Sequence, residues 1–138
     1  RTPALLRVFF SLRARGVLTA RLRLKSGAEL AVLNTHMPHK TDNTVRMWRL
    51  GEMAAGAAAD GAHVVLGGDF NPLASVPTPA QFAPLLAHGN VPTHAFEAPA
   101  NRTWDLTQPL TRAEGESTRG MQLDFIFVQP RCAAVMHA

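Results

Sequence analysis

The sequence has almost no cysteine and no long apolar run, and each absence excludes a class of protein. Its single cysteine, Cys132, excludes an internal disulfide framework and a zinc site built from several cysteines. No apolar run reaches the roughly 18 residues of a membrane-spanning helix. The first residues, 1–3, include neither an initiator methionine nor the apolar segment of a signal peptide. We therefore expect a soluble chain taken from the middle of a longer one, and its compartment stays open.

What is present fits a single domain that spans residues 1–138. A hydrophobic content of 46% is ordinary for a globular protein. The net charge of +4 favours polyanionic partners such as nucleic acid or an anionic membrane surface. The arginines are spread along the chain, however, so a solvated surface explains the same excess.

The first third of the chain predicts a β-hairpin. Leu5–Leu12 is a short apolar run that predicts a buried strand, and Val17–Leu24 predicts a second strand because its residues alternate. One face of that strand carries Leu18, Ala20, Leu22 and Leu24, and the other carries Thr19, Arg21 and Arg23. Turn residues at 25–27 separate it from a third apolar strand over Glu29–Thr35, which leads to His36.

A helix and another strand follow. Thr41 or Asp42 caps a helix that runs to about Ala59. Its apolar stripe consists of Met47, Leu50, Ala54 and Ala57. His63–Leu66 is then a short apolar strand that runs into two glycines. Strand, helix and strand with short connections form a βαβ unit, so the two strands are predicted to be parallel in one sheet of an α/β fold.

The remainder of the chain predicts fewer elements. Pro72–Pro99 holds six of the ten prolines and predicts a loop with at most short helices, one of them starting at Thr78-Pro79. Residues Thr103–Gly120 are polar and rich in turn formers. Leu123–Val128 alternates and predicts the last strand.

The most informative polar residues follow the apolar strand over His63–Leu66. Gly67-Gly68 allow a sharp turn or a close approach to a ligand, and Asp69 and Asn71 come next. Ligands of open α/β sheets bind at the carboxyl ends of the strands. A turn capped by Asp and Asn is the simpler interpretation, but the whole Gly-Gly-Asp-Phe-Asn string favours a functional site.

Two more residues support that interpretation. His36 ends the neighbouring strand, where an imidazole beside a carboxylate can exchange a proton near neutral pH. A lone histidine at a strand end is usually structural, but Asp69 and Asn71 nearby favour chemistry. Asp124 lies in an apolar strand, which is costly unless the carboxylate is hydrogen-bonded or near a cation. An edge strand that exposes this face is the alternative.

Three motifs together resemble the endonuclease/exonuclease/phosphatase superfamily. They are Asn34-Thr35-His36, Gly68-Asp69-Phe70-Asn71 and Leu123-Asp124-Phe125-Ile126-Phe127, in this order and at about these separations. The resemblance covers nearly the whole chain. It implies a four-layer α/β sandwich, two packed β-sheets flanked by helices, with the site at one edge. It also implies hydrolysis of a phosphodiester by in-line attack of water, assisted by Mg²⁺ or Mn²⁺.

The resemblance also implies a role for each polar residue. His36 would hydrogen-bond the phosphate or protonate the leaving oxygen, and Asp69 would orient or deprotonate the attacking water. Asn71 would hold a phosphate oxygen, and Asp124 would complete the network that positions a catalytic histidine or the metal. The metal ligands would be Asp69 and Asp124.

Within the superfamily, the sphingomyelinase-like branch looks closest, on Arg15-Gly16-Val17-Leu18 and Thr103-Trp104-Asp105. That branch implies a sphingomyelin or phospholipid substrate, contacted by Asn34, His39 and Trp104. His39 is otherwise an ordinary loop residue, and a loop tryptophan usually packs. A nuclease is the alternative, with the arginines of Val17–Leu24 along a groove, although such a face is equally normal for a solvated hairpin.

The sequence departs from the superfamily pattern at both ends. The pattern includes a glutamate that is the principal metal ligand, and no suitable carboxylate precedes Glu29. It also ends in Ser-Asp-His, which Met136-His137-Ala138 does not match. We therefore expect a chain truncated at both ends, with its missing part supplied elsewhere in a larger assembly, or a non-catalytic remnant with a structural role. Retention of His36, Asp69, Asn71 and Asp124 argues against the remnant.

Overall fold

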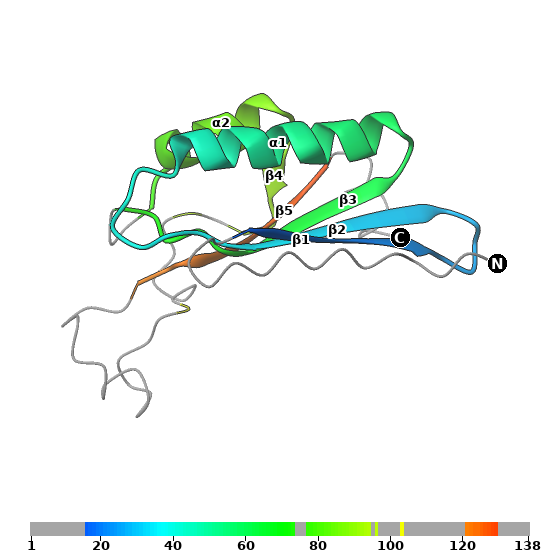
Figure 1. The fold of residues 1–138 in the computed structure, drawn as a ribbon, viewed down its shortest axis with the longest axis horizontal. Coiled ribbons are helices and arrows are strands. Elements are labelled where there is room, and N and C mark those ends of the chain that lie inside the picture. The colour runs from blue at the N-terminus through cyan, green and yellow to red at the C-terminus, as the bar shows by residue number, and fades with distance from the viewer. Residues whose placement is uncertain (1–15, 74–76, 95, 97–102, 104–120, 130–138) are drawn as a thin grey trace.

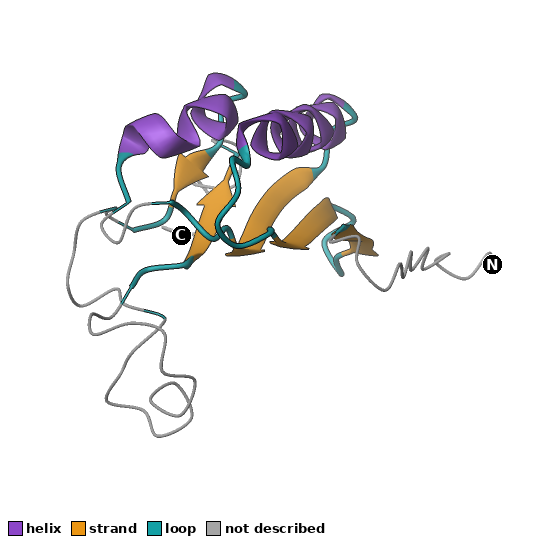
Figure 2. Cartoon of the chain, turned by 60° about the vertical axis from the view of Figure 1, so that its left-hand side comes forward, coloured by secondary structure: helices purple, strands orange, loops and turns teal. Residues whose placement is uncertain are grey.

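The computed structural model describes residues 16–73, 77–94, 96, 103 and 121–129. They form a five-stranded sheet in the order β1-β2-β3-β5-β4, with the helices on one face (Figures 1 and 2). The strands are β1 (Val17–Arg23), β2 (Glu29–His36), β3 (His63–Asp69), β4 (Val91–Pro92) and β5 (Asp124–Val128). The helices are α1 (Thr44–Ala59), the 3-10 helix η1 (Pro79–Phe82) and α2 (Ala83–Ala87). The predicted α/β class is confirmed.

The predicted hairpin and βαβ unit are both present. β1 pairs antiparallel with β2, and β2 pairs parallel with β3 across α1. β3 continues past its predicted end at Leu66, through both glycines to Asp69. β5 pairs antiparallel with β3, a neighbour that the sequence did not predict. The described residues form one sheet and one layer of helices, and the predicted strand over Leu5–Leu12 lies outside them.

Helix α1 is bounded by a polar side chain at its start and a glycine at its end. The N-cap residue is Asn43, not Thr41 or Asp42 as predicted, and its side chain makes no capping hydrogen bond. The Asp42 carboxylate, one residue earlier, accepts the N–H of Thr44, the first helical residue, at 2.8 Å. At the other end, Gly61 has a φ of +90°, which an L side chain rarely adopts. Its N–H donates to Ala58 O, and the Ala62 N–H donates to Ala57 O, which completes a Schellman motif.

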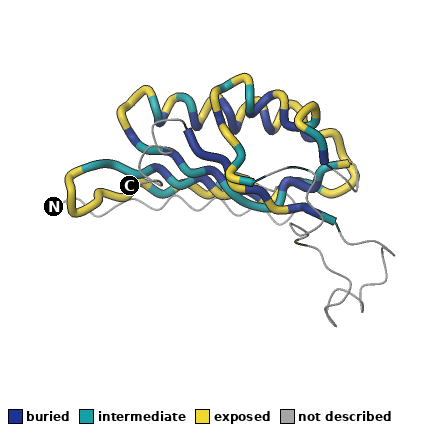
Figure 3. Tube along the Cα trace, turned by 180° about the vertical axis from the view of Figure 1, so that it is seen from behind, coloured by how far each residue is buried: buried dark blue, intermediate teal, exposed yellow. Residues whose placement is uncertain are grey.

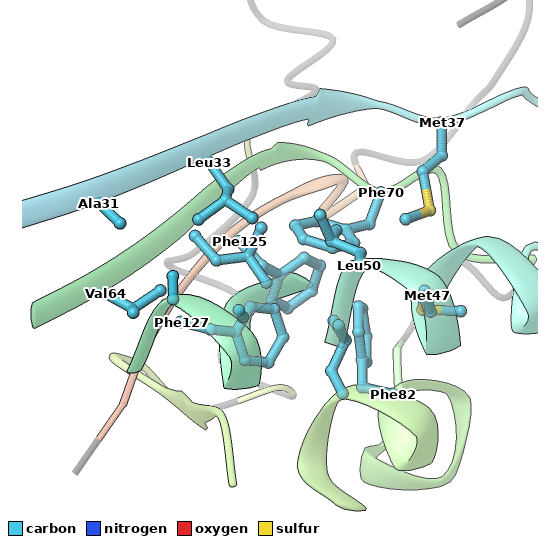
Figure 4. Close-up of a cluster of buried hydrophobic side chains, with 14 of the residues drawn as sticks. Ala31, Leu33, Met37, Met47, Leu50, Val64, Phe70, Phe82, Phe125 and Phe127 are labelled. Carbon is cyan, nitrogen blue, oxygen red and sulfur yellow. The ribbon is translucent and has the colours of Figure 1, made fainter. Parts of the chain in front are cut away.

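The core lies between the sheet and the helices (Figure 4). The predicted stripe of α1 is buried, and the inward residues of β2, β3 and β5 pack against it. At the centre is a phenylalanine cluster, in which the ring centroids of Phe82 and Phe125 are 4.6 Å apart and those of Phe70 and Phe127 are 5.4 Å apart. Burial of each such ring stabilises the fold by about 1.5–3 kcal/mol.

The opposite face of the sheet carries exposed apolar side chains. Leu18 is 45% exposed, Leu22 is 49% exposed and Ile126 is 48% exposed. Figure 3 shows β1 and the turn of the hairpin as largely exposed. The apolar face predicted for Val17–Leu24 therefore points away from the helices. The described helices cover only one face of β3 (Figure 2).

The proline-rich stretch is more structured than the sequence predicts. η1 begins at Pro79, as predicted, and its capping box places Gln81 Oε1 2.9 Å from the Thr78 N–H. β4, which the sequence does not predict, pairs with β5 at the edge of the sheet, where a proline is tolerated. None of the described helices is long and apolar enough to cross a membrane.

Candidate active site

Strand register brings three of the predicted site residues into one row. His36 pairs with Asp69 between β2 and β3, and Asp69 pairs with Asp124 between β3 and β5. Cross-strand partners project from the same face of a sheet. Because the flanking Thr35 and Met37 are buried on the helix side, this row lies on the opposite face, at the carboxyl ends of β2 and β3.

The histidine and the central carboxylate are in contact. His36 Nε2 lies 3.5 Å from Asp69 Oδ2, and the His36 side chain is 60% exposed whereas that of Asp69 is 25% exposed. The other oxygen, Asp69 Oδ1, accepts the Asn71 N–H at 2.8 Å. Asp69 is thus held in one orientation from two sides. The imidazole beside it is open to solvent and to a substrate.

Asp124 is fixed through its backbone. The Thr103 hydroxyl accepts the N–H groups of Leu123 and Asp124, each at 3.0 Å, at the start of β5. Two carboxylates directly opposite each other are unfavourable unless positive charge lies nearby. A protonated His36 or a bound cation would relieve the repulsion between Asp69 and Asp124. Thr103 belongs to one of the motifs of the resemblance, but this anchoring role was not predicted.

The backbone conformation at position 68 explains why the Gly-Asp-Phe-Asn motif begins with a glycine. Its φ is +133°, and a Cβ at this position would lie 1.9 Å from the Thr35 carbonyl oxygen. Only glycine fits, because β2 and β3 approach closely where His36 and Asp69 leave the sheet. Asn34 Oδ1 is the next neighbour, 2.9 Å from the same Cβ position. Asn34 is exposed and lies two residues before His36, on the same face of the sheet.

Phe70 and Asn71 anchor the strand end. Phe70, the residue directly after Asp69, is 1% exposed and lies in the phenylalanine cluster. Its burial anchors the backbone beside Asp69 to the core. Asn71 has a φ of +42° and is 6% exposed. Its side-chain amide donates to Met37 O at 2.8 Å and so ties the loop after β2 to the end of β3. This structural bond was not predicted, and the phosphate-binding role of Asn71 stays a prediction.

A second buried asparagine supports the same loop. Asn43 is 4% exposed, and its side-chain amide donates to Pro38 O at 3.0 Å. Its position just before α1 was the only sequence signal for this role. His39 is exposed in the same loop. Trp104, the third predicted substrate contact, lies outside the described residues.

The two predicted metal ligands do not make a metal site by themselves. Asp69 and Asp124 offer the oxygen donors that Mg²⁺ prefers, but this ion needs near-octahedral coordination. Within the part of the chain that the structure describes, no group of three or more His, Cys, Asp or Glu could hold a metal ion. These residues therefore do not fit a complete metal centre by themselves.

Neither a protein-family model nor a curated protein matches the chain. Solved structures do match it in fold. A beta toxin from Staphylococcus aureus is 18% identical with a TM-score of 0.58, and the match covers 84% of this chain and 43% of the toxin. The endonuclease domain of the telomere-specific non-LTR retrotransposon TRAS1 is 11% identical with a TM-score of 0.60, and the match covers 86% of this chain and 52% of the endonuclease domain.

A mannosyl-6-phosphatase from Bacteroides thetaiotaomicron is 20% identical with a TM-score of 0.53, over 84% of this chain and 43% of the phosphatase. The chain thus spans about half the length of these structures or less, and identities this low show the fold alone. The resemblance predicted from the motifs is confirmed at the level of the fold: the chain shares part of the α/β fold of these structures.

Proposed function

We propose that the protein hydrolyses phosphodiesters at the sheet edge that carries His36, Asp69 and Asp124. The observation that carries this proposal is their alignment in one row, with the imidazole 3.5 Å from the Asp69 carboxylate. A structural domain has no physical need for two opposed carboxylates and an exposed imidazole at a strand end. The shared fold with an endonuclease domain and a phosphatase supports the same class of chemistry.

The chemistry assigned to this row is an in-line displacement at phosphorus. Asp69 orients the attacking water and accepts its proton, and its two anchored oxygens keep it in place for this role. As the new P–O bond forms, the bond to the leaving group breaks. His36 hydrogen-bonds the phosphate or protonates the leaving oxygen. Asp124 lies opposite Asp69 and completes the polar network.

Metal dependence belongs to the proposal as an expectation from the fold. Mg²⁺ or Mn²⁺ would neutralise charge on the phosphate, with Asp69 and Asp124 as two of its ligands. The remaining ligands would come from residues outside those described or from another chain.

Two features favour a lipid phosphodiester, such as sphingomyelin or a phospholipid at a membrane surface. Arg21 is paired with Asp60 at 2.6 Å, and Arg23 with Glu29 at 3.3 Å, so these arginines do not form a free basic stripe. They also lie at the end of the hairpin far from His36. Beside His36, a cavity of about 200 Å³ has mostly apolar walls.

Two alternatives stay open for the experiment to separate. A nuclease of the same fold is one, with nucleic acid as its partner. A non-catalytic domain within a larger assembly is the other, and the incomplete set of metal ligands among the described residues favours it.

The test is hydrolysis of bis(4-nitrophenyl) phosphate by the purified protein with Mg²⁺ or Mn²⁺. Asp69→Asn and His36→Ala are each expected to lower kcat by about 100-fold or more, the usual contribution of a general acid or base. Asp60→Asn is the matched control, because Asp60 is an exposed carboxylate at the other end of α1. Unchanged activity in both site variants would overturn the assigned mechanism, and no activity in any protein would favour the non-catalytic domain.

Substrate and metal are tested with the same protein. Sphingomyelin vesicles are expected to be hydrolysed faster than single-stranded DNA at equal phosphate concentration, and the reverse order would favour the nuclease. EDTA is expected to abolish hydrolysis, and added Mg²⁺ to restore it. Full activity in EDTA would contradict the metal dependence.

A further inference from the structure

Strand β1 forms one edge of the sheet. Among the residues that the structure describes, β1 has a neighbour on one side only, because the strand order begins with β1 and β2. Its residues Val17–Arg23 pair with β2 in an unbroken register, and the segment contains neither proline nor glycine. Natural edge strands are usually interrupted by prolines or bulges, because an open edge pairs readily with another strand. β1 is therefore a template for the addition of a strand.

The hydrogen bonds of the hairpin show which backbone groups of β1 are directed toward this edge. The Leu24 N–H donates to Ala28 O at 2.8 Å, so the backbone of Leu24 is directed toward the β2 side of the hairpin. This direction alternates along an antiparallel strand. The even-numbered residues of β1 therefore bond to β2, and the odd-numbered residues direct their N–H and C=O groups outward. These outward residues are Val17, Thr19, Arg21 and Arg23.

Helix α1 leaves room beside this edge. A cavity of about 700 Å³ lies between the helix and the hairpin, and its lining includes Thr19 and Arg21 of β1 and Met53 and Gly56 of α1. A Cβ added at Gly56 would meet no atom within 4 Å. A further strand can therefore lie beside β1 without a collision with α1.

We propose that the partner at this edge is a second copy of the chain, and that the two β1 strands pair antiparallel across a two-fold axis at Ala20. This register uses the whole strand and places outward residues opposite outward residues, as the ladder of hydrogen bonds requires. On the face of the sheet opposite the helices, Leu18 of one copy lies opposite Leu22 of the other. Both leucines are nearly half exposed, and as cross-strand partners they would shield each other from water.

The side chains of β1 favour this register over its neighbours. With the axis at Ala20, Arg21 lies opposite Thr19 of the other copy, and Arg21 keeps its ion pair with Asp60 at 2.6 Å. With the axis at Arg21, the two copies of this arginine would lie directly opposite each other, which is destabilising. With the axis at Thr19, Leu22 would lie opposite Gly16 and lose its apolar partner.

The dimer leaves both candidate sites accessible. A two-fold axis between antiparallel strands stands perpendicular to the sheet, so each side chain stays on its own face. The two rows of His36, Asp69 and Asp124 would therefore lie on the same face of one continuous sheet, away from the shared edge. The inference does not depend on the proposed hydrolysis, and either can fail without the other.

Disulfide trapping tests the register in a chain whose single cysteine is removed by Cys132→Ser. Ala20→Cys then places the two sulfur atoms opposite each other at the axis, within the range that a disulfide spans. Val32→Cys is the control, because Val32 lies beside Ala20 on β2. In the edge dimer its two copies would be three strand spacings apart, roughly 14 Å. Oxidation is expected to give a covalent dimer with Ala20→Cys only, and equal cross-linking of both variants would overturn the edge pairing in favour of stacked sheet faces.

Sedimentation velocity over a range of concentrations tests the dimer without added cysteines. Leu22→Lys puts a charge opposite Leu18 at two symmetric places and is expected to raise the dimer dissociation constant about tenfold. Val91→Lys is the matched control, because Val91 is 45% exposed and Leu22 is 49% exposed, but Val91 lies on β4 at the other edge of the sheet. Its effect is expected to be about twofold or less.

Two results of this measurement would overturn the inference. Equal weakening by both lysine variants would assign the association to the face of the sheet and not to the β1 edge. A wild-type protein that stays monomeric at every concentration would mean that no second copy occupies the edge.

Discussion

At the scale of single residues, the strand end depends on a backbone position that only glycine can occupy. Gly68→Ala would force a Cβ to within 1.9 Å of the Thr35 carbonyl oxygen at a φ of +133°. We expect this change to cost about 3 kcal/mol or more of unfolding free energy, since strained backbone and overpacking each cost about 1–3 kcal/mol. Urea unfolding should show a lower midpoint with an unchanged slope.

The preceding glycine is the control. A Cβ at Gly67 would meet Phe125 O at 3.6 Å and Ile126 Cγ1 at 3.7 Å, which are ordinary contacts. We expect Gly67→Ala to change stability by less than about 1 kcal/mol. Equal losses in the two variants would show that the close approach of β2 and β3 is not what selects glycine at 68.

Asp42 makes the stability of α1 depend on acid pH. Its hydrogen bonds from Thr44 lower its pKa below the ordinary value of 3.8. The carboxylate form is therefore favoured in the folded state. Its contribution is complete above pH 3.8 and is lost as the pH falls below 3.8 through the lower, folded-state pKa.

We therefore expect Asp42→Ala to reduce the unfolding free energy at neutral pH and to have a progressively smaller effect in strong acid. The measurement is chemical denaturation of both proteins between neutral pH and the acid limit of folding. A difference that stays constant across this range would contradict the assigned role of the carboxylate.

At the scale of elements, helix α1 has two glycines with opposite environments. A Cβ added at Gly56 would meet no atom within 4 Å, whereas a Cβ at Gly51 would lie 2.5 Å from His88 Cδ2. Gly56→Ala should stabilise the protein by about 0.5–1 kcal/mol through helix propensity. Gly51→Ala should destabilise it, because His88 is packed against Trp48 with ring centroids 4.7 Å apart. Thermal unfolding separates the two, and stabilisation by both changes would mean that His88 moves aside freely.

Local sequence patterns predicted the hairpin and α1 well, because the residues that specify these elements lie within them or next to them in the sequence. The turn at 25–27 and the stripe at Met47, Leu50, Ala54 and Ala57 each lie within a few residues of the structure they specify. β4 and the pairing of β5 beside β3 depend on partners tens of residues away. No local pattern reports such a partner.

The candidate site also has a part that local sequence patterns predict and a part that they do not. The row of His36 and Asp69 was predictable, because a βαβ unit places the ends of both strands at one edge. The bond from Asn71 to Met37 O and the support from Asn43 were not, because an asparagine near a turn has many possible partners.

At the scale of the whole molecule, the described sheet has one covered face and one open face. Leu18 and Ile126 belong to the same cross-strand row, which also includes Asn34 and Gly67. Both are nearly half exposed. We infer that exposed apolar side chains on this open face favour association.

We expect the double variant Leu18→Thr and Ile126→Thr to self-associate less than the parent protein, as measured by sedimentation velocity over a range of concentrations. Val45→Thr is the control, because Val45 is 74% exposed but lies on α1, away from this face. An equal change in the control would show that general surface hydrophobicity, and not the open face of the sheet, drives association.

The register of the sheet has a consequence for how this chain can vary in evolution. A shift of one residue in β2, β3 or β5 would turn each side chain to the opposite face. His36, Asp69 and Asp124 would then no longer form a row, although no site residue had been substituted. Insertions and deletions should therefore be selected against in these strands and tolerated at the hairpin turn around Gly27. As a result, the spacing of the motifs should be retained in relatives whose overall sequence identity is low.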